Sequence, residues 1–374
     1  MEAVAAFAAI AVAWVALVYL YLRHAGLVAA ALVAPLAAAG AAAWLAYDRF
    51  DNEADFAVLA GMFGVVFFCA VADRMSRGIC AGMTPGRAAM RASLVLFFAV
   101  GPALVGVVAL ALAFAASSAV RSAGIAAFEA SLMVFAASLA AIWATVPFPY
   151  TEQFIGRANR AREWRSRQGA RLAFLGETRW ALSITGIAAI FAVLAVFGAR
   201  SVPFYPALGG LADPAVAIVL AFAAFLASAR DWRMAAAMTA TVLLMFALER
   251  WALSYRLAYL SERDTLWTAA LFLPAIAAMC LIAARWNDCL REGDYVGAAL
   301  QRSLEEEAPG AVFASAIVAV FWLTQTLSVW RVTPALAAAF MSFAAGPLIF
   351  PALAMTIYAL LPRYVSIEEA LNKR

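Results

Sequence analysis

The side chains that could do chemistry in this sequence are few, and several lie within apolar segments. Glu129 stands about two turns inside one such segment, and Glu249 and Arg250 lie near the end of another. An ionisable group inside a segment long enough to span a membrane is costly unless it is paired or lines a polar path. We expect Glu129 either to bond to a neighbouring helix or to line a substrate or coupling path. Glu249 and Arg250 are candidates for the same path or for a local pair near the interface.

Enzymatic chemistry finds little support in the sequence. His24 is the only histidine, so neither a histidine metal site nor a serine-histidine triad can be assembled. Cys69, Cys80, Cys280 and Cys289 form no CxxC pair, and we expect free thiols. Glycine-rich phosphate loops are missing from the sequence as well. We therefore expect no catalytic residue, no metal and no cofactor. A lipid-modifying enzyme is accordingly less favoured than the transport and scaffold functions that the rest of the sequence supports.

The composition places these side chains in a membrane. The 374 residues are 67% hydrophobic and 13% charged, with a mean hydropathy of +0.89, whereas soluble domains carry about 25% charged residues. The net charge of +4 is small and the basic residues are spread along the chain, which argues against a nucleic-acid partner. We expect an all-α polytopic membrane protein.

Apolar runs between charged residues, glycine or proline predict about eleven transmembrane helices. The spans are 3–22, 26–47, 56–73, 92–117, 123–146, 180–199, 213–229, 234–250, 265–284, 309–329 and 334–361. With the N-terminus outside, 20 of the 27 lysine and arginine residues fall on cytoplasmic connections, as the positive-inside rule requires. The sequence therefore predicts a multi-pass inner-membrane protein with its N-terminus outside and its C-terminus in the cytoplasm. Ser303 and Glu306 have the spacing of a capping box that would start the span at 309.

The longest connection, residues 148–179, is rich in arginine. Apolar residues, Trp164 among them, stand beside six arginines: Arg157, Arg160, Arg162, Arg165, Arg167 and Arg171. This composition is typical of a helix that lies in the headgroup layer of an anionic membrane. Two interpretations stay open, a basic cytoplasmic linker between two halves of the protein and a site that binds lipid headgroups or a partner.

A motif occurs twice, 211 positions apart, in the form C-x4-R-x7-G-x3-G-x-A-x2-R. Its copies contain Arg74, Gly82, Gly86 and Arg91, and Arg285, Gly293, Gly297 and Arg302. Each copy ends one span and begins the next, which predicts two parallel five-helix repeats, 1–147 and 213–362. The linker 148–179 and a connecting span, 180–199, separate the repeats, and 363–374 form a cytoplasmic tail. We expect the glycines to form tight turns, and the arginines at 74 and 285 to reach the headgroups.

These residues resemble the membrane half of resistance-nodulation-division (RND) transporters, most closely the branch that exports lipids and other hydrophobic molecules. The resemblance rests on residues 61–64, 72–77 and 82–91 in the first copy and on 285–288, 291–300 and 346–353 in the second. It implies helical halves that move relative to one another around a path for a hydrophobic or amphipathic substrate such as a lipid. Membrane lipids and a partner protein with soluble domains or an energy source are the partners that it implies.

Two features depart from that family. The family inserts large extracytoplasmic domains, whereas only residues 200–212 follow the connecting span here. The family also couples transport to protons through acidic residues within its spans, and the matching positions are Val66 and Ala277. Two functions therefore stay open. One is an RND-like permease or permease subunit for a hydrophobic substrate, and the other is a non-transporting scaffold or assembly subunit that has lost proton coupling.

Overall fold

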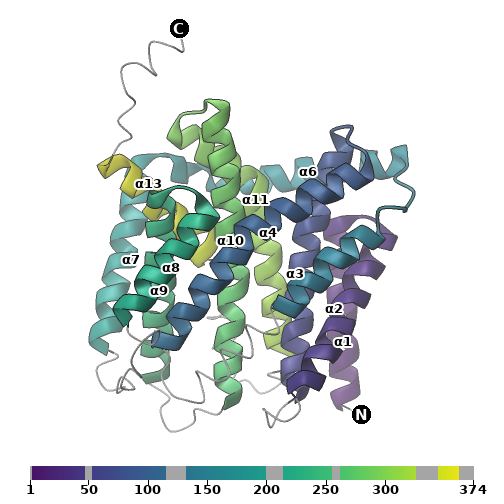
Figure 1. Cartoon of the computed structure of the whole chain (residues 1–374), viewed down its shortest axis with the longest axis horizontal. Coiled ribbons are helices and arrows are strands. Elements are labelled where there is room, and N and C mark those ends of the chain that lie inside the picture. The colour runs from purple at the N-terminus through teal and green to yellow at the C-terminus, as the bar shows by residue number, and fades with distance from the viewer. Residues whose placement is uncertain are drawn as a thin grey trace.

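A computed structural model of the chain describes residues 2–46, 53–114, 132–198, 214–254, 262–325 and 344–361. Within these ranges all regular structure is helical, as the sequence predicts (Figure 1). The helices are α1 (Glu2–Leu22), α2 (Ala25–Ala46), α3 (Glu53–Cys80), α4 (Pro85–Phe114), α6 (Glu152–Gly169), the 3-10 helix η1 (Ala170–Gly176), α7 (Thr178–Gly198), α8 (Pro214–Ala229), α9 (Trp232–Ser254), α10 (Glu262–Glu292), α11 (Val296–Gln325), the π-helix η4 (Ala345–Ile349) and α13 (Phe350–Leu360). A further helix covers Leu132–Ala144.

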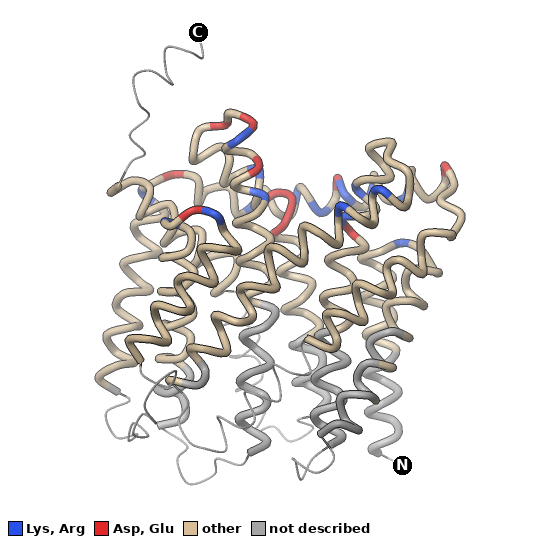
Figure 2. The backbone as a smooth tube through the Cα atoms, viewed as in Figure 1, with Lys and Arg blue, Asp and Glu red and all other residues tan. Residues whose placement is uncertain are grey.

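Two of these helices contain a segment long and apolar enough to cross a membrane, Pro85–Leu110 in α4 and Thr178–Phe197 in α7. On α7 the side chains of Ile190 and Val196 are 61% and 62% exposed, which suits a lipid-facing helix. The charged residues whose side chains the structure describes gather at one end of the bundle, where Figure 2 shows them in blue and red. This arrangement fits a helical membrane protein, while the count of eleven spans and the orientation of the termini stay predictions.

Several helices are longer than the spans expected from apolarity. α3 continues to Cys80, and α11 begins at Val296 rather than near 309. The expected capping box is therefore wrong, because Ser303 lies inside α11 and its Oγ donates to the Leu300 carbonyl at 2.9 Å. Apolar runs mark where a helix is surrounded by hydrocarbon, whereas the helix itself can continue through charged turns beyond that layer.

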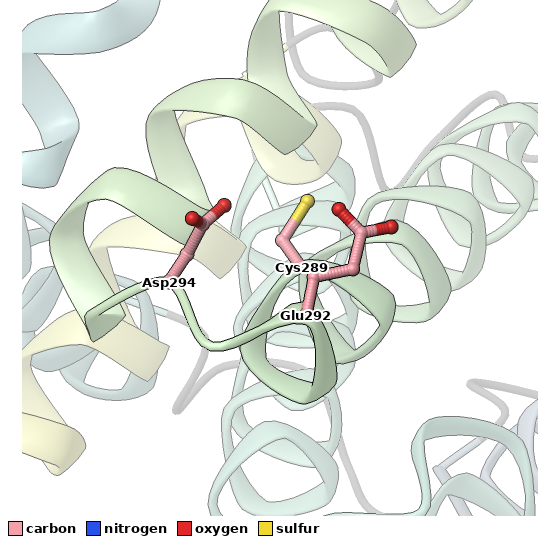
Figure 3. Close-up of side chains that lie close together, drawn as sticks. All are labelled: Cys289, Glu292 and Asp294. Atoms are coloured by element: carbon pink, nitrogen blue, oxygen red, sulfur yellow. The ribbon is translucent and has the colours of Figure 1, made fainter. Parts of the chain in front are cut away.

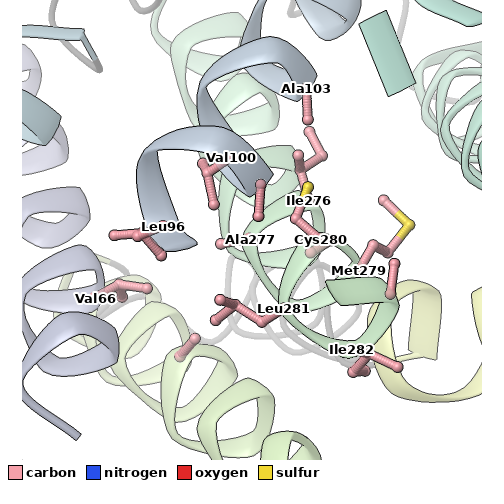
Figure 4. Packing of buried hydrophobic residues seen from close by; sticks show 14 of the residues in the cluster. Val66, Leu96, Val100, Ala103, Ile276, Ala277, Met279, Cys280, Leu281 and Ile282 are labelled. Atoms are coloured by element: carbon pink, nitrogen blue, oxygen red, sulfur yellow. The ribbon is translucent and has the colours of Figure 1, made fainter. Parts of the chain in front are cut away.

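Helices from the two predicted halves pack closely through small residues. α4 and α8 share the most extensive helix contact among the described elements. A Cβ added at Gly106 of α4 would lie 3.1 Å from the Ala224 Cβ of α8, so the two backbones approach closely. Leu96 and Val100 of α4 lie beside Ala277 of α10 in the same apolar core (Figure 4). This core supports the charged end of the bundle, where the functional candidates gather.

The two motif turns use glycine for the same reason. Gly82, between α3 and α4, has a φ of +86°, and Gly293, between α10 and α11, has a φ of +102°. The two amides donate at corresponding positions, to the Ile79 carbonyl at 2.9 Å and the Leu290 carbonyl at 3.3 Å. Residues with a Cβ are strained in this left-handed region, so each turn requires glycine, as the sequence predicts.

We expect Gly82→Ala to lower the free energy of unfolding by about 1–2 kcal/mol, because alanine is strained at positive φ. A Cβ there would meet no atom within 4 Å, so the loss reports backbone strain alone. Gly156→Ala is the matched control, since Gly156 lies inside α6 and also has open space around its Cα. It should stabilise the protein by about 0.5–1 kcal/mol. Denaturant unfolding in detergent measures both, and equal effects would contradict the assigned turn.

Candidate functional site

Ten charged side chains form a continuous series of ion pairs at the charged end of the bundle. The series joins Arg74, Arg77, Arg165, Arg285 and Arg302 to Asp73, Glu292, Asp294, Glu306 and Glu307. The side chains come from α3, α6, α10, α11 and the turn between the last two. Five cations face five carboxylates, so the network has no net formal charge. Balance of this kind lets charges enter a region that excludes water.

Asp73 and Glu307 form the buried end of the network, with side chains 9% and 5% exposed. Arg165 Nη1 lies 2.7 Å from Asp73 Oδ1, and Arg77 Nη2 lies 3.1 Å from Asp73 Oδ2. Glu307 Oε1 accepts hydrogen bonds from Arg77 Nη1 at 2.9 Å and from Arg74 Nη2 at 3.0 Å. Arg77 therefore connects an acid of its own helix, α3, with an acid of α11.

Arg74 and Arg285, the corresponding arginines of the two motif copies, bind neighbouring glutamates of α11. Arg74 donates to Glu307, while Arg285 donates to Glu306 through Nε at 2.9 Å and Nη2 at 3.0 Å. Their side chains are 12% and 17% exposed, which differs from the expectation that both reach into the headgroups. A carboxylate at bonding distance is a stronger partner than screened headgroups, so both arginines turn toward α11.

Arg165 is brought to Asp73 by the way α6 lies on the bundle. Thr151 caps α6, and Gly169 lets its last turn approach the α11 backbone. The Arg165 guanidinium also lies 4.6 Å from the centre of the Tyr21 ring. Burial lowers the pKa of Arg165, but Asp73 and Tyr21 raise it by more, so the group stays charged. Arg165 thus departs from the headgroup role expected for the six arginines, whereas the other five are exposed.

A small cavity adjoins the buried end of the network. Its volume is about 20 Å³, and its lining includes Tyr21, Asp73, Arg77 and Glu307. A volume of this size accommodates roughly one water molecule. Val66 and Ala277, the positions aligned with the acidic residues of the RND family, line the same cavity as buried apolar residues.

Cys289, Glu292 and Asp294 lie together at the exposed end of the network, with potential ligand atoms within 4.8 Å of one another (Figure 3). Arginines already neutralise the carboxylates, since Glu292 pairs with Arg302 at 2.7 Å and with Arg285 at 3.3 Å. Burial raises the pKa of the Cys289 thiol, which disfavours the thiolate that a metal ion binds. We assign these residues to the ion network rather than to a metal centre.

The other residues of the motif have separate positions. Gly297 faces η1, where an added Cβ would lie 2.7 Å from the Gly176 carbonyl oxygen. Gly86 and Arg91 lie in the first turns of α4, with Arg91 exposed and outside the network. The repeated spacing therefore combines residues with different local roles.

The predicted path residues are not placed by the structure. Glu129 lies outside the described residues. Glu249 and Arg250 belong to α9, but their side chains also lie outside the described part of the chain. A substrate or coupling path at these three positions stays a prediction.

His24 has a structural position. Its Nδ1 accepts a hydrogen bond from the Leu27 amide at 3.2 Å, in the first turn of α2. The ring stacks against Phe148 and Tyr150 and meets the edge of Phe154, with a centroid distance of 5.1 Å to the last. These contacts attach the connection after Leu132–Ala144 to the turn between α1 and α2.

The contacts of Asp73, Glu306 and Glu307 with the arginines of the network were not predicted from the sequence. A signal was present, because these acids occur on the side of the bundle where arginine predominates, and three consecutive glutamates, 305–307, stand beside a single arginine. Such acids need cations from elsewhere in the fold, and the motif arginines are the nearest candidates in the predicted topology.

No family model and no curated protein matches this sequence. The crystal structure of SecDF, a translocon-associated membrane protein from Thermus thermophilus, is similar with a TM-score of 0.56 and 13% sequence identity. The similarity covers 100% of this chain and 63% of the SecDF chain, so this chain spans less than two thirds of that protein. The likeness concerns the fold, and it supports a helical membrane architecture, while the resemblance to the RND family stays a prediction. The lipid-exporter branch is a finer prediction that it does not test.

We expect Glu307→Gln to lower the free energy of unfolding by about 3–5 kcal/mol, because it leaves buried arginines without their carboxylate. Glu177→Gln is the matched control. Glu177 pairs with Arg179 at 2.8 Å, but the two side chains are 49% and 76% exposed, so its loss should cost less than about 1 kcal/mol. Denaturant unfolding of the purified protein in detergent compares the two variants. Similar losses would show that the network is solvated rather than buried.

The stability supplied by Glu307 should depend on pH in one direction. Burial raises the pKa of Glu307, but Arg74 and Arg77 lower it by more, so the pKa lies below its ordinary value. Its contribution is complete above the pKa of an unfolded glutamate, about 4.3, and is lost as the pH falls through the lower folded value. The difference in stability between wild type and Glu307→Gln should therefore stay constant from about pH 8 to about pH 6 and shrink below about pH 4. A difference that shrinks between pH 8 and pH 6 would mean that this pKa is raised.

Proposed function

We propose that this protein is a transporter-like or accessory membrane protein whose two halves move relative to one another at the contact between α1, α3 and α11. The observation that carries the proposal is the ion pair between Arg74 and Glu307, which joins residues 233 positions apart beside a water-sized cavity. The free-energy cost of removing two charges from water offsets much of their mutual attraction in a buried ion pair. Once water enters and hydrates both ions, the pair can therefore separate at a modest cost. Such a contact suits an interface that opens.

The proposal includes two parallel five-helix repeats, residues 1–147 and 213–362. Motif spacing and the shared conformation of Gly82 and Gly293 support it. A second pair of turns supports it as well, because Arg23 after α1 and Arg230 after α8 both have a φ of 55°, which is uncommon for arginine. Parallel repeats of this kind place a path at their interface.

The two contacts between such repeats differ in chemistry. Where α4 meets α8, Gly106 packs against Ala221 and Ala224, and Ser228 Oγ donates to the Ala99 carbonyl. Where α1 meets α11, Tyr21 borders the cavity that the charged groups surround. Tight apolar packing loses many contacts when it separates, whereas ions gain water. The α1 side is therefore the side that opens in this proposal, and the α4 side is the pivot.

A hydrophobic or amphipathic substrate such as a lipid suits a path between apolar helices. Similarity to SecDF, which is described as translocon-associated, supports an accessory role beside a partner protein. The inner membrane, with the C-terminus in the cytoplasm, is the location that the arginine distribution favours.

A non-transporting scaffold or assembly subunit is the second candidate. Val66 and Ala277 favour it, because both are apolar and buried, with 6% and 3% of their surface exposed. A chain without acidic groups at these positions lacks the coupling route of the RND family. In this alternative the ion network holds the halves together permanently.

Alkylation of two cysteines distinguishes a moving interface from a fixed one. Cys69 and Cys280 occupy corresponding motif positions, and each is 1% exposed. We expect N-ethylmaleimide to modify Cys69 several-fold faster in Glu307→Gln than in the wild type, because loss of the ion pair favours opening at α3. Cys280, near the pivot, should stay protected. Peptide mass spectrometry of protein in nanodiscs measures both, and the half-buried Cys80 reports reagent access.

Protection of Cys69 in both proteins would favour the scaffold. Equal acceleration at Cys69 and Cys280 would mean that the variant loosens the whole bundle, and would contradict an opening restricted to one side. Isolation of a stoichiometric partner with soluble domains tests the subunit form of either function.

A further inference from the structure

The arginines of the connection between the two halves are unequally placed around α6 and η1. Arg165 faces the bundle, whereas a separate set recurs at alternating intervals of three and four residues along one outer face. This set, called the α6 stripe below, consists of Arg157, Arg160, Trp164, Arg167 and Arg171. All five side chains are exposed, and Trp164 has 62% of its surface free.

The stripe holds four arginines, and the exposed Glu163 lies three residues after Arg160 and four before Arg167, so cations outnumber carboxylates on this face. Within the described ranges none of its four arginines forms an ion pair, and the Nε of Arg160 donates only to the Gly156 carbonyl of its own helix. Arg165 on the same helix is fully engaged by Asp73. Arg165 therefore has a structural role, whereas the four arginines of the stripe are available to an external anion.

The stripe adjoins the start of an apolar helix. Its last member, Arg171, belongs to η1, which leads directly into α7 and the apolar segment Thr178–Phe197. Phe174 and Trp180 meet edge to face at the start of that segment, with centroids 5.9 Å apart. Exposed aromatic side chains at the end of an apolar helix mark the headgroup level. The charged end of the bundle, which includes α6, is visible in Figure 2.

α6 also holds the stripe in a fixed position. Gly169 and Gly176 allow α6 and η1 to approach the backbone of α11, and Arg165 ties the middle of α6 to α3. A binding face on a supported helix loses little conformational freedom when its ligand arrives.

We propose that the α6 stripe binds the headgroups of anionic phospholipids, with guanidinium groups on the phosphates and the Trp164 indole at the boundary with the acyl chains. The planar guanidinium of arginine can donate two parallel hydrogen bonds to two oxygens of one phosphate, and an indole among arginines suits the headgroup layer. The continuity of η1 with an apolar segment favours a membrane over nucleic acid or an acidic protein. The site is independent of whether the protein transports a substrate.

The test compares thermal unfolding of the full-length protein in an uncharged detergent with added dioleoylphosphatidylglycerol or dioleoylphosphatidylcholine. The stripe variant is R157Q/R160Q/R167Q/R171Q. The control variant, R87Q/R91Q/R162Q/R291Q, removes the same number of exposed arginines outside the stripe. We expect phosphatidylglycerol to raise the unfolding midpoint of the wild type and the control by several degrees more than phosphatidylcholine does. The stripe variant should lose most of this difference.

Two single variants test the contributions of the Trp164 indole and of Arg165 separately. Trp164→Ala should lose part of the selectivity while keeping its midpoint without lipid. Arg165→Gln should lower the midpoint without lipid and keep the selectivity, because Arg165 belongs to the network.

The proposal is overturned by equal losses in the stripe and control variants, which would show a response to net charge alone. It is also overturned if phosphatidylglycerol has no selective effect on the wild type. Equal stabilisation by inorganic phosphate would mean that no lipid is required. Stripe-dependent stabilisation by a short RNA, without an effect of phosphatidylglycerol, would assign the surface to a different partner.

Discussion

Charge neutrality in a region that excludes water is the constraint on which this end of the bundle depends. An unpaired Asp73 or Glu307 would be strongly destabilising there, so the cations from α3 and α6 must reach them. This requirement fixes how far the helices extend. α11 must begin well before its apolar span, because Glu306 and Glu307 can only meet α3 and α10 from a turn that projects beyond the hydrocarbon.

The motif register shows how two similar segments acquire different chemistry. Arg74 and Arg285 correspond, yet both bind α11, because the positions of α4 that match Glu306 and Glu307 are Val95 and Leu96. Leu96 is fully buried against the apolar core instead. A single acidic pair thus receives both motif arginines, and the network forms on one side of the bundle while tight apolar packing forms on the other.

Features with a local cause were predictable from the sequence. Helices follow from long apolar runs, and the turns at Gly82 and Gly293 follow from glycine at a helix end. The partners of Arg165 and Glu307 were not predictable, because an ion pair between distant helices depends on the rotation of each helix about its axis. Six arginines in 157–171 have the same chemical character in the sequence. Only the face that α6 presents to α3 separates Arg165 from the rest.

α6 links the buried network to the surface, since one helix carries both Arg165 and the exposed stripe. Displacement of α6 from the bundle would separate Arg165 from Asp73. The buried ion pair and the proposed attraction of the stripe to anionic lipid therefore both act on α6. Their responses to salt differ, because mobile ions screen exposed charges within about 10 Å at 0.1 M and screen buried pairs much less. Rising ionic strength should therefore weaken the proposed attachment of α6 to an anionic membrane before it weakens the attachment of α6 to α3.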